Sequence, residues 1–377
     1  MYRLFYLNRS LRCLYVKNPC VTNFLYAEYG FCLIFKIERT TINTGRLVKM
    51  YIFGEKTMNI VSLERNTAGT DISVDCWNEL GNVTIYGETV TEEEISERVK
   101  DAEIIIINKS PMNERTLKDA PNVKLICELA TGYDNCDLAY CNSRGIKVCN
   151  VRDYSTDMVA QHTFTLALAL SQKLMHYDNF VKSGAYSAQN GFASFYPAFY
   201  ELTGKTWGII GMGNIGKKVA KIATAFGCKV MFHSITGKSS CTDYPQVDFE
   251  TLLKESDILS LHCPLSDLSR NLIDKEALRK MKKSAILVNV ARGPVVNNAD
   301  LYEALINDEI QAAGLDVLEK EPLELSNPLS QFKDSNRLII TPHLAWASVE
   351  ARTRCVQGVY ENIKAFLNGT PRNVVNL

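Results

Sequence analysis

The stretch that decides the fold is Thr206-Trp207-Gly208-Ile209-Ile210 followed by Gly211-Met212-Gly213-Asn214-Ile215-Gly216. A short apolar run, typical of a buried strand, leads into G-x-G-x-x-G and then into a helix-like segment. In such a turn the first glycine allows the tight bend, the second lets the backbone approach a pyrophosphate, and the third lets helix and strand pack closely. The helix N-terminus then presents N–H groups to the phosphates. Residues 211–216 are therefore predicted to bind a dinucleotide, and the alternative is a glycine-rich turn that binds nothing.

Short apolar runs alternate with helix-like segments on both sides of this motif. Runs typical of buried strands cover 59–63, 83–86, 104–107, 123–127 and 146–149 before it, and 229–232, 258–261, 285–290, 312–317 and 338–341 after it. Helix-like segments lie between them, among them 71–80 and 158–174, and a helical tail covers 348–367. Such alternation is typical of parallel sheets covered by helices.

The fold class predicted from this order is α/β with two domains, a doubly wound Rossmann dinucleotide-binding domain inserted in a flavodoxin-like substrate-binding domain. We expect residues 58–155 and 344–377 to form the substrate-binding domain and residues 156–343 the dinucleotide-binding domain. Residues 1–57 hold nine Lys and Arg against three Asp and Glu, without a regular apolar period. We expect this segment to be an extension outside the fold, such as an upstream start codon chosen in error would produce. The alternative is a genuine targeting or membrane-surface arm.

Composition excludes several classes of protein. The 377 residues suffice for two to three domains at roughly 150 residues each. Positive and negative side chains balance at 42 each, so no net field attracts nucleic acid or a membrane surface, and neither is an expected partner. The twelve cysteines show no C-x-x-C pair and no metal-ligand spacing, which predicts a reduced, cytoplasmic chain without a metal site. No apolar run approaches the ~18 residues of a membrane span.

The end of the second strand after the glycine motif bears on the choice of cofactor. A site specific for NAD usually carries Asp or Glu there, ~20 residues on, to accept from the ribose 2′-hydroxyl. This chain has Phe232-His233-Ser234 instead. Ser234 has no charge to repel a 2′-phosphate, and Lys238 can attract one, although Lys238 is equally well explained as a solvated loop charge. The sequence leaves NADP and NAD open.

Three residues late in the chain have the chemistry of a hydride-transfer site. Arg292, Glu321 and His343 each follow a predicted strand, at the edge where open α/β sheets bind ligands. In the reduction of a 2-keto acid, arginine holds the carboxylate and polarises the carbonyl, and histidine supplies a proton to the nascent alkoxide. A carboxylate beside the imidazole orients it and favours its protonated form. Taken singly, the three are also explained as a surface contact, a solvated charge and a buried hydrogen-bonded histidine.

Six stretches of the chain carry a resemblance to one family. They are Ala130-Thr131-Gly132-Tyr133-Asp134-Asn135, Gly211 to Gly216, Leu261-His262-Cys263-Pro264-Leu265, Val288-Asn289-Val290-Ala291-Arg292-Gly293, Ala313-Gly314-Leu315-Asp316-Val317 and Thr341-Pro342-His343. Over roughly 320 residues, from about Met58 to the end, the chain resembles the D-2-hydroxyacid dehydrogenases. Asn108-Lys109 and Ala345-Trp346-Ala347 are most similar to the branch of hydroxypyruvate reductases and glycerate dehydrogenases.

The resemblance implies roles for individual residues. By position, the family's catalytic Arg, Glu and His fall on Arg292, Glu321 and His343. Its Asp that binds the nicotinamide carboxamide falls on Asp316. Backbone N–H groups near Thr131 and Gly132 are implied to hold the substrate carboxylate beside Arg292. Further implied cofactor contacts are Pro264 and Ala291.

The function expected from this resemblance is the NAD(P)H-dependent, reversible reduction of a small 2-keto acid to the D-2-hydroxy acid, with hydroxypyruvate or glyoxylate favoured. The resemblance also implies a homodimer. A binding protein is the alternative, because the C-terminal-binding-protein corepressors resemble the same family and use the dinucleotide as a ligand. The lack of an extended, Pro-rich tail weighs against it. We expect the other histidines to serve packing or capping; they are His162, His176, His233 and His262.

Overall fold

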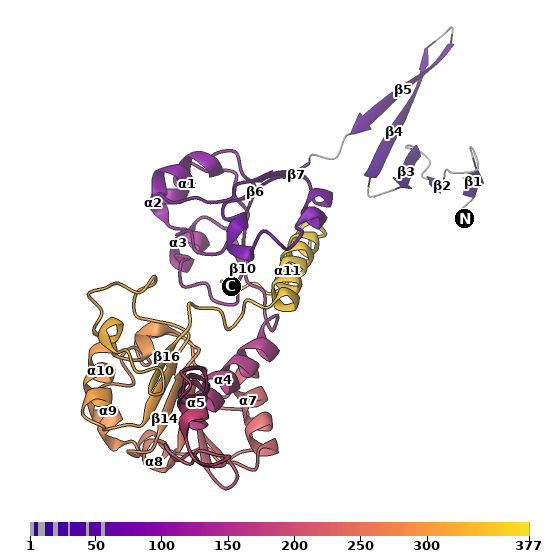
Figure 1. Cartoon of the computed structure of the whole chain (residues 1–377). Helices are drawn as coiled ribbons and strands as arrows, with labels where there is room; N and C mark the ends of the chain where they lie inside the picture. Colours follow the sequence, from indigo (N-terminus) through magenta and orange to yellow (C-terminus); the bar gives the residue numbers. More distant parts are fainter. Residues whose placement is uncertain are drawn as a thin grey trace. The chain divides into compact units, whose positions relative to one another are not determined.

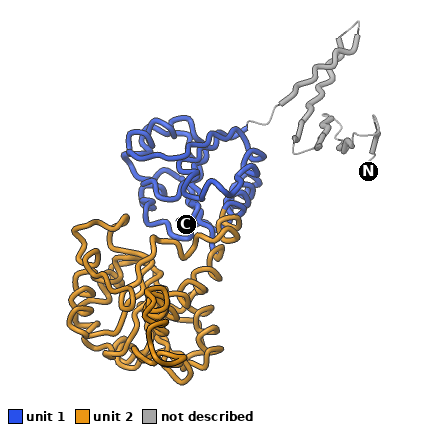
Figure 2. The backbone as a smooth tube through the Cα atoms, viewed as in Figure 1, with its two compact units in different colours: residues 1–152, 356–377 blue, residues 153–355 orange. Residues whose placement is uncertain are grey.

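The computed structural model describes residues 57–376 with their side chains, and before them the backbone of five strands (Figure 1). These strands fall in the predicted extension, residues 1–57, and pair antiparallel in chain order; they are β1 (Leu4–Tyr6), β2 (Arg12–Lys17), β3 (Thr22–Glu28), β4 (Phe31–Ile42) and β5 (Gly45–Phe53). The chain divides into two compact units, residues Met1–Arg152 with Val356–Leu377 (unit 1) and residues Asp153–Cys355 (unit 2), which Figure 2 distinguishes by colour. Within residues 57–376, no helix has both the length and the apolar character that a membrane span needs.

The described part of unit 1 is built on a five-stranded parallel sheet. Its strands are β6 (Asn59–Ser62), β7 (Asn82–Ile85), β8 (Ile104–Ile107), β9 (Leu125–Glu128) and β10 (Lys147–Cys149), in the order β10-β9-β8-β6-β7. Numbered within the unit and read from the other edge, this order is 2-1-3-4-5, the flavodoxin-like topology. Every residue of β8 and β9 is buried, because helices cover both faces of such a sheet. The predicted fold of this domain is confirmed.

The helical segments of unit 1 are short. They are η1 (Arg65–Ala68), η2 (Asp75–Glu79), α1 (Glu92–Val99), α2 (Glu114–Leu117), α3 (Leu138–Ser143) and the part of α11 (Val349–Leu367) from Val356 on. The helix predicted over 71–80 is wrong in type and length, since only the 3₁₀ turn η2 forms there. Trp77 in that turn is fully buried, and its Nε1 donates to the carbonyl of Val356 at 3.2 Å. A tertiary contact therefore fixes this segment where local helix propensity does not.

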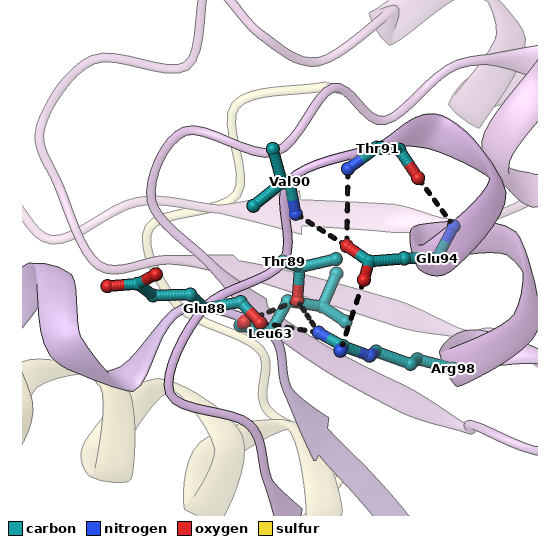
Figure 3. A network of polar contacts seen from close by, with 7 residues as sticks. All are labelled: Leu63, Glu88, Thr89, Val90, Thr91, Glu94 and Arg98. Atoms are coloured by element: carbon teal, nitrogen blue, oxygen red, sulfur yellow. Dashed lines mark hydrogen bonds and ion pairs between the residues drawn. The ribbon is translucent and has the colours of Figure 1, made fainter.

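Helix α1 begins with a capping box that ties it to the end of β6 (Figure 3). The Glu94 backbone N–H donates to the Thr91 hydroxyl at 3.2 Å, and the Glu94 carboxylate accepts from the Thr91 backbone N–H at 3.3 Å. These bonds satisfy N–H groups that the first helical turn leaves without intrahelical partners. One turn later, Arg98 donates to the hydroxyl of Thr89, which itself donates to the carbonyl of Leu63. The polar chain in Figure 3 thus links helix α1 to Leu63, just after the carboxyl end of β6.

Unit 2 is a doubly wound sheet of six parallel strands. They are β11 (Thr206–Ile210), β12 (Lys229–His233), β13 (Ile258–Leu261), β14 (Ile286–Asn289), β15 (Ala312–Leu315) and β16 (Leu338–Ile340), in the order β12-β11-β13-β14-β15-β16. The order reverses direction at β11, between β12 and β13, which is where open α/β sheets bind their ligands. The predicted Rossmann-type domain is confirmed.

Helices cover both faces of this sheet. They are α4 (Thr156–Ser171), α5 (Leu174–Lys182), α6 (Ala185–Ala188), α7 (Asn214–Ala225), α8 (Phe249–Glu255), α9 (Lys275–Lys280), η3 (Gly293–Val295), α10 (Asn298–Ile306), η4 (Pro328–Gln331) and the first residues of α11. The single helix predicted over 158–174 is in fact two helices. Lys173 has a left-handed backbone, with φ 55°, and separates α4 from α5. The apolar composition continues across this break, so composition alone did not reveal it.

Close packing between α4 and the sheet fixes the core of unit 2. Trp207 of β11 is fully buried, stacks on Phe164 with ring centroids 4.5 Å apart, and donates from Nε1 to the Ser260 hydroxyl at 2.9 Å. A Cβ added at Gly314 in β15 would lie 2.9 Å from the Cβ of Leu166, so glycine is needed for the helix to approach that strand. The packing of α4 against β11 and β15 therefore fixes the positions of these strands and of their carboxyl ends.

Candidate functional site

The glycine turn after β11 has the geometry that a dinucleotide needs. Gly211 has φ 93°, and a Cβ there would lie 2.8 Å from the backbone N of Cys263, while a Cβ at Gly216 would lie 2.2 Å from the carbonyl oxygen of Gly211. Gly213, by contrast, has no heavy atom within 4 Å of its Cβ position. Both tight positions are therefore structural, and the open side of Gly213 leaves room for a pyrophosphate at the N-terminus of α7. Of the other predicted contacts in this turn, Met212 is buried, Ile215 is half-buried and Asn214 is exposed.

The end of β12 places Ser234 and Lys238 together in one loop. The Ser234 hydroxyl is buried and donates to the carbonyl of Lys238 at 2.9 Å. Because its proton is engaged, Ser234 can accept a hydrogen bond but does not offer one to a 2′-phosphate. Thr236, Lys238 and Ser239 are exposed beyond it. The exposed side-chain donors to a phosphate in this loop are therefore those of Thr236, Lys238 and Ser239.

The side chains of His343 and Glu321, which the sequence predicts to be catalytic, lie within hydrogen-bond distance of each other. His343 Nδ1 lies 2.7 Å from Glu321 Oε2, which is a short, charge-assisted hydrogen-bond distance. Glu321 is itself fixed, because its Oε1 accepts from the backbone N–H of Leu318 at 2.9 Å. Both side chains are partly exposed, at 26% for His343 and 35% for Glu321, so the pair is accessible to a ligand. With Nδ1 occupied by Glu321, Nε2 is the ring nitrogen left to meet a substrate.

Asp316 organises the turn that carries His343. Its Oδ1 accepts from the Thr341 hydroxyl at 2.6 Å and from the Leu344 backbone N–H at 2.9 Å, and its Oδ2 accepts from the Ala345 backbone N–H at 2.8 Å. The backbone N–H of His343 donates to the Asp316 carbonyl at 2.8 Å. His343 is held there with a left-handed φ of 53°. The hydrogen bonds to Asp316 therefore stabilise the unfavourable left-handed backbone of His343.

Asp316 remains ionised although it is only 1% exposed. Burial acts to raise its pKa, but hydrogen bonds from His162, Thr341 and the backbone N–H groups of Ala345 and Leu344 outweigh burial and lower the pKa. His162 Nε2 lies 3.0 Å from the Thr341 hydroxyl and 3.5 Å from Asp316 Oδ1. His162 thus belongs to the site, although the sequence suggested only packing. Its signal was an imidazole ring among the buried, mostly apolar residues of helix α4.

Arg292, Ala291 and Pro264 lie at neighbouring strand ends. Arg292 follows β14, its Nη1 donates to the carbonyl of Ala291 at 2.9 Å, and its carbonyl accepts from the Asn289 amide at 3.0 Å. Gly293, the next residue, packs so closely that a Cβ would lie 1.8 Å from the carbonyl oxygen of Leu318. Pro264 follows β13 beside the glycine turn and is exposed. The structure thus brings every predicted residue of unit 2 to the carboxyl edge of one sheet.

Thr131 and Gly132 lie in unit 1, after β9. The Thr131 hydroxyl donates to the carbonyl of Val151 at 3.0 Å, and its carbonyl accepts from the Asn150 amide at 2.7 Å. Within residues 57–376, no residue accepts a hydrogen bond from the backbone N–H of Thr131 or Gly132. This loop is therefore fixed through its other atoms and keeps two donors available. No cluster of three metal-ligating side chains occurs in the described part of the chain.

Comparisons with known proteins agree with this architecture. Residues 164–345 match the family described as "D-isomer specific 2-hydroxyacid dehydrogenase, NAD binding domain". The chain is 41% identical to a glycerate dehydrogenase of Methylorubrum extorquens over 85% of this chain and 99% of the relative. It is 36% identical to a hydroxypyruvate reductase of Blautia hydrogenotrophica over 79% of this chain and 92% of the relative. A solved structure of an acyclic imino acid reductase, in complex with NADPH and D-Arg, superposes with a TM-score of 0.76 at 30% identity, covering 84% of this chain and 100% of that one.

The fold and the site define a dinucleotide-dependent oxidoreductase that acts on a CH–OH group, with NAD or NADP as its cofactor. The chain belongs to the D-isomer specific 2-hydroxyacid dehydrogenase family. This confirms the resemblance seen in the sequence motifs, including its branch, and does not favour the alternative of a binding protein that only senses the dinucleotide.

Proposed function

We propose that the protein reduces hydroxypyruvate or glyoxylate to the D-2-hydroxy acid and catalyses the reverse oxidation. The observation that carries the proposal is the His343–Glu321 pair at 2.7 Å, placed with Arg292 at the ends of three adjacent strands. A glycerate dehydrogenase and a hydroxypyruvate reductase among the relatives support hydroxypyruvate, which is the 2-keto form of glycerate, and a glyoxylate reductase of Aeropyrum pernix, 40% identical over 69% of this chain, supports glyoxylate.

The residues of the site divide the work of the reaction. When bound, the dinucleotide supplies the hydride that reaches C2 of the keto acid. Arg292 binds the carboxylate and polarises the C2 carbonyl, together with the open N–H groups of Thr131 and Gly132. His343 donates its Nε2 proton to O2, and Glu321 holds the ring through Nδ1. In the oxidation His343 Nε2 accepts the proton from the hydroxyl group.

The turnover assay tests this proposal most directly. We expect hydroxypyruvate and glyoxylate to be reduced faster than pyruvate and phenylpyruvate, with a D-configured product wherever C2 becomes chiral. His343→Ala serves as the control for background reduction. Equal or faster turnover of phenylpyruvate would contradict the assignment of a small substrate, and no turnover of any 2-keto acid would contradict the proposed reaction.

We also infer how the dinucleotide is held. Residues 211–216 bind the pyrophosphate, and Pro264 and Ala291 contact the cofactor from neighbouring strand ends. Asp316 is the residue that the resemblance assigns to the nicotinamide carboxamide, and in the described structure its two oxygens hold the turn of His343. The absence of a carboxylate at the end of β12 supports the acceptance of NADPH, with contacts to the 2′-phosphate from Lys238 and its exposed neighbours. The buried hydroxyl oxygen of Ser234 remains able to accept a hydrogen bond in this loop.

The assembly and location of the protein are part of the same proposal. The segment after α6 exposes several large aromatic side chains, which supports a homodimer formed with a second copy of the chain. They are Phe192, Phe195, Tyr196 and Tyr200, each more than two thirds exposed. Nine free cysteines among the described residues support a cytoplasmic location. The balanced charge supports the expectation that nucleic acid and membranes are not partners.

A further inference from the structure

The carboxyl edge of the sheet in unit 1 contains a built loop that the proposed mechanism does not use. Glu64, after β6, is 7% exposed, and its carboxylate accepts three hydrogen bonds from the loop after β8. Oε2 accepts from the backbone N–H groups of Asn108 and Lys109, both at 2.7 Å, and Oε1 accepts from the Ser110 hydroxyl at 2.7 Å. Charge-assisted bonds of this kind fix a loop more firmly than neutral ones.

Lys109 is the exposed residue in the centre of this loop. Across the described ranges its ammonium forms no hydrogen bond and no ion pair with another side chain. The residues on either side of it, Asn108 and Ser110, are buried, so the backbone cannot turn the lysine away without breaking the bonds to Glu64. The backbone that carries this cation is therefore fixed at the edge of the sheet, and no acidic side chain of the described residues lies within ion-pair distance of the ammonium, although Glu128 is near enough for its pKa to be lowered by the lysine's charge.

The Lys109 loop lies beside the loop that carries Thr131 and Gly132. Strands β8 and β9 are direct neighbours in the sheet, with Ile107 paired to Glu128, and the backbone N–H of Leu129 donates to the carbonyl of Ile107 at 2.6 Å. The Asn135 amide donates to the carbonyl of Ser110 at 3.0 Å and joins the two loops again further out. One edge thus combines an ammonium with two N–H groups that have no acceptor in the described residues, which is the donor set of an anion site.

We propose that Lys109 binds the substrate carboxylate together with the N–H groups of Thr131 and Gly132, and that Glu64 is the residue that positions Lys109. This inference deepens the proposed function and rests on it. A hydrated ammonium has three donors and no fixed fork, so Lys109 adds charge to the two backbone donors at this edge of unit 1. Because every 2-keto acid has the carboxylate, the contribution of Lys109 is common to all substrates.

The test compares Lys109→Met and Lys109→Arg with Lys118→Met, a matched change at an exposed lysine of the same unit. Loss of one charge-assisted hydrogen bond predicts a KM about 10- to 100-fold higher for Lys109→Met, similar for hydroxypyruvate, glyoxylate and pyruvate, with kcat within about threefold of wild type. Lys109→Arg restores part of the affinity. Lys118→Met leaves KM unchanged, and NADPH affinity measured by fluorescence is the same in all variants.

Glu64→Gln tests the positioning role through a double-mutant cycle. We expect it to raise KM in the wild-type background but to add less than about twofold when Lys109 is already Met, because its effect passes through the lysine. Fully additive effects would show a general structural role and refute the positioning. An unchanged KM in Lys109→Met, or an increase confined to hydroxypyruvate, would overturn the carboxylate assignment. Failure of the proposed function is a separate result, since the wild type itself would then not turn over any 2-keto acid.

Discussion

Glu128, the last residue of β9, should make the stability of unit 1 depend on pH. It is fully buried, its Oε1 accepts from the Cys136 thiol at 3.1 Å, and its Oε2 has no partner in the part of the chain that the structure describes. Burial raises the pKa of Glu128 to about 8; hydrogen bonds from Cys136 and Asn135 oppose the shift, and the nearby charge of Glu64 adds to it. At pH 7 the folded protein therefore holds this carboxyl group in its neutral form.

The size of the effect follows from linkage between protonation and folding. In the unfolded chain the carboxyl titrates near its ordinary pKa of 4.5, so between pH 4.5 and pH 8 folding must take up a proton. Each pH unit in that window lowers the free energy of unfolding by about 1.4 kcal/mol, and the loss ends near pH 8, where the folded group ionises as well. Glu128→Gln is neutral at every pH. Its stability relative to wild type should rise by about 3 kcal/mol between pH 5.5 and pH 7.5.

Hydrogen exchange measured by mass spectrometry gives the required local free energy. Peptides from β9 and β10 of wild type and Glu128→Gln are compared at the same pH, so the intrinsic exchange chemistry cancels. Glu97→Gln is the matched control, because Glu97 is 71% exposed on α1 and should show no difference that grows with pH. Protection that runs parallel in wild type and Glu128→Gln from pH 5.5 to 7.5 would refute the reasoning, since it would mean that Glu128 is ionised in the folded state.

Four further outcomes are expected. His343→Ala should lose roughly 10²- to 10⁴-fold in kcat with NADPH binding retained; normal kcat in His343→Ala across pH would contradict the mechanism. Ser234→Asp should shift the ratio of kcat/KM from NADPH toward NADH by repelling the 2′-phosphate; an unchanged NADH preference in both proteins would refute the cofactor assignment. Asp316→Asn should lower kcat, because an amide donor then meets a backbone N–H in the turn of His343; full activity would show that the turn holds without the carboxylate. A chain that starts at Met58 should match the full chain in activity and melting temperature, and lost stability together with native peptides from residues 4–46 would show a genuine N-terminal segment.

Much of the fold could be predicted because buried parallel strands have a clear signature. Ile104–Ile107 is four isoleucines in succession, and the structure makes all four fully buried in β8. The glycine turn could also be predicted, since close contacts at Gly211 and Gly216 leave no room for a side chain. Segments whose conformation depends on tertiary contacts could not be predicted from the sequence. The turn around Trp77 takes its shape from a bond to Val356, which is far away in the sequence.

The same distinction applies to the candidate site, where residues at strand ends could be predicted and contacts with a second element could not. Residues that follow strand ends share one edge of a sheet whatever their separation in sequence, so Arg292, Glu321 and His343 could be brought together from the strand pattern alone. A contact between a strand end and the face of a helix has no such rule. His162 reaches Thr341 only because close packing at Gly314 brings α4 down onto the sheet, and the sequence gives no register for that packing. The groups that support a site from a second element are therefore the ones that require a structure, and Glu64, which reaches from the end of β6 to the loop of Lys109, belongs to the same class.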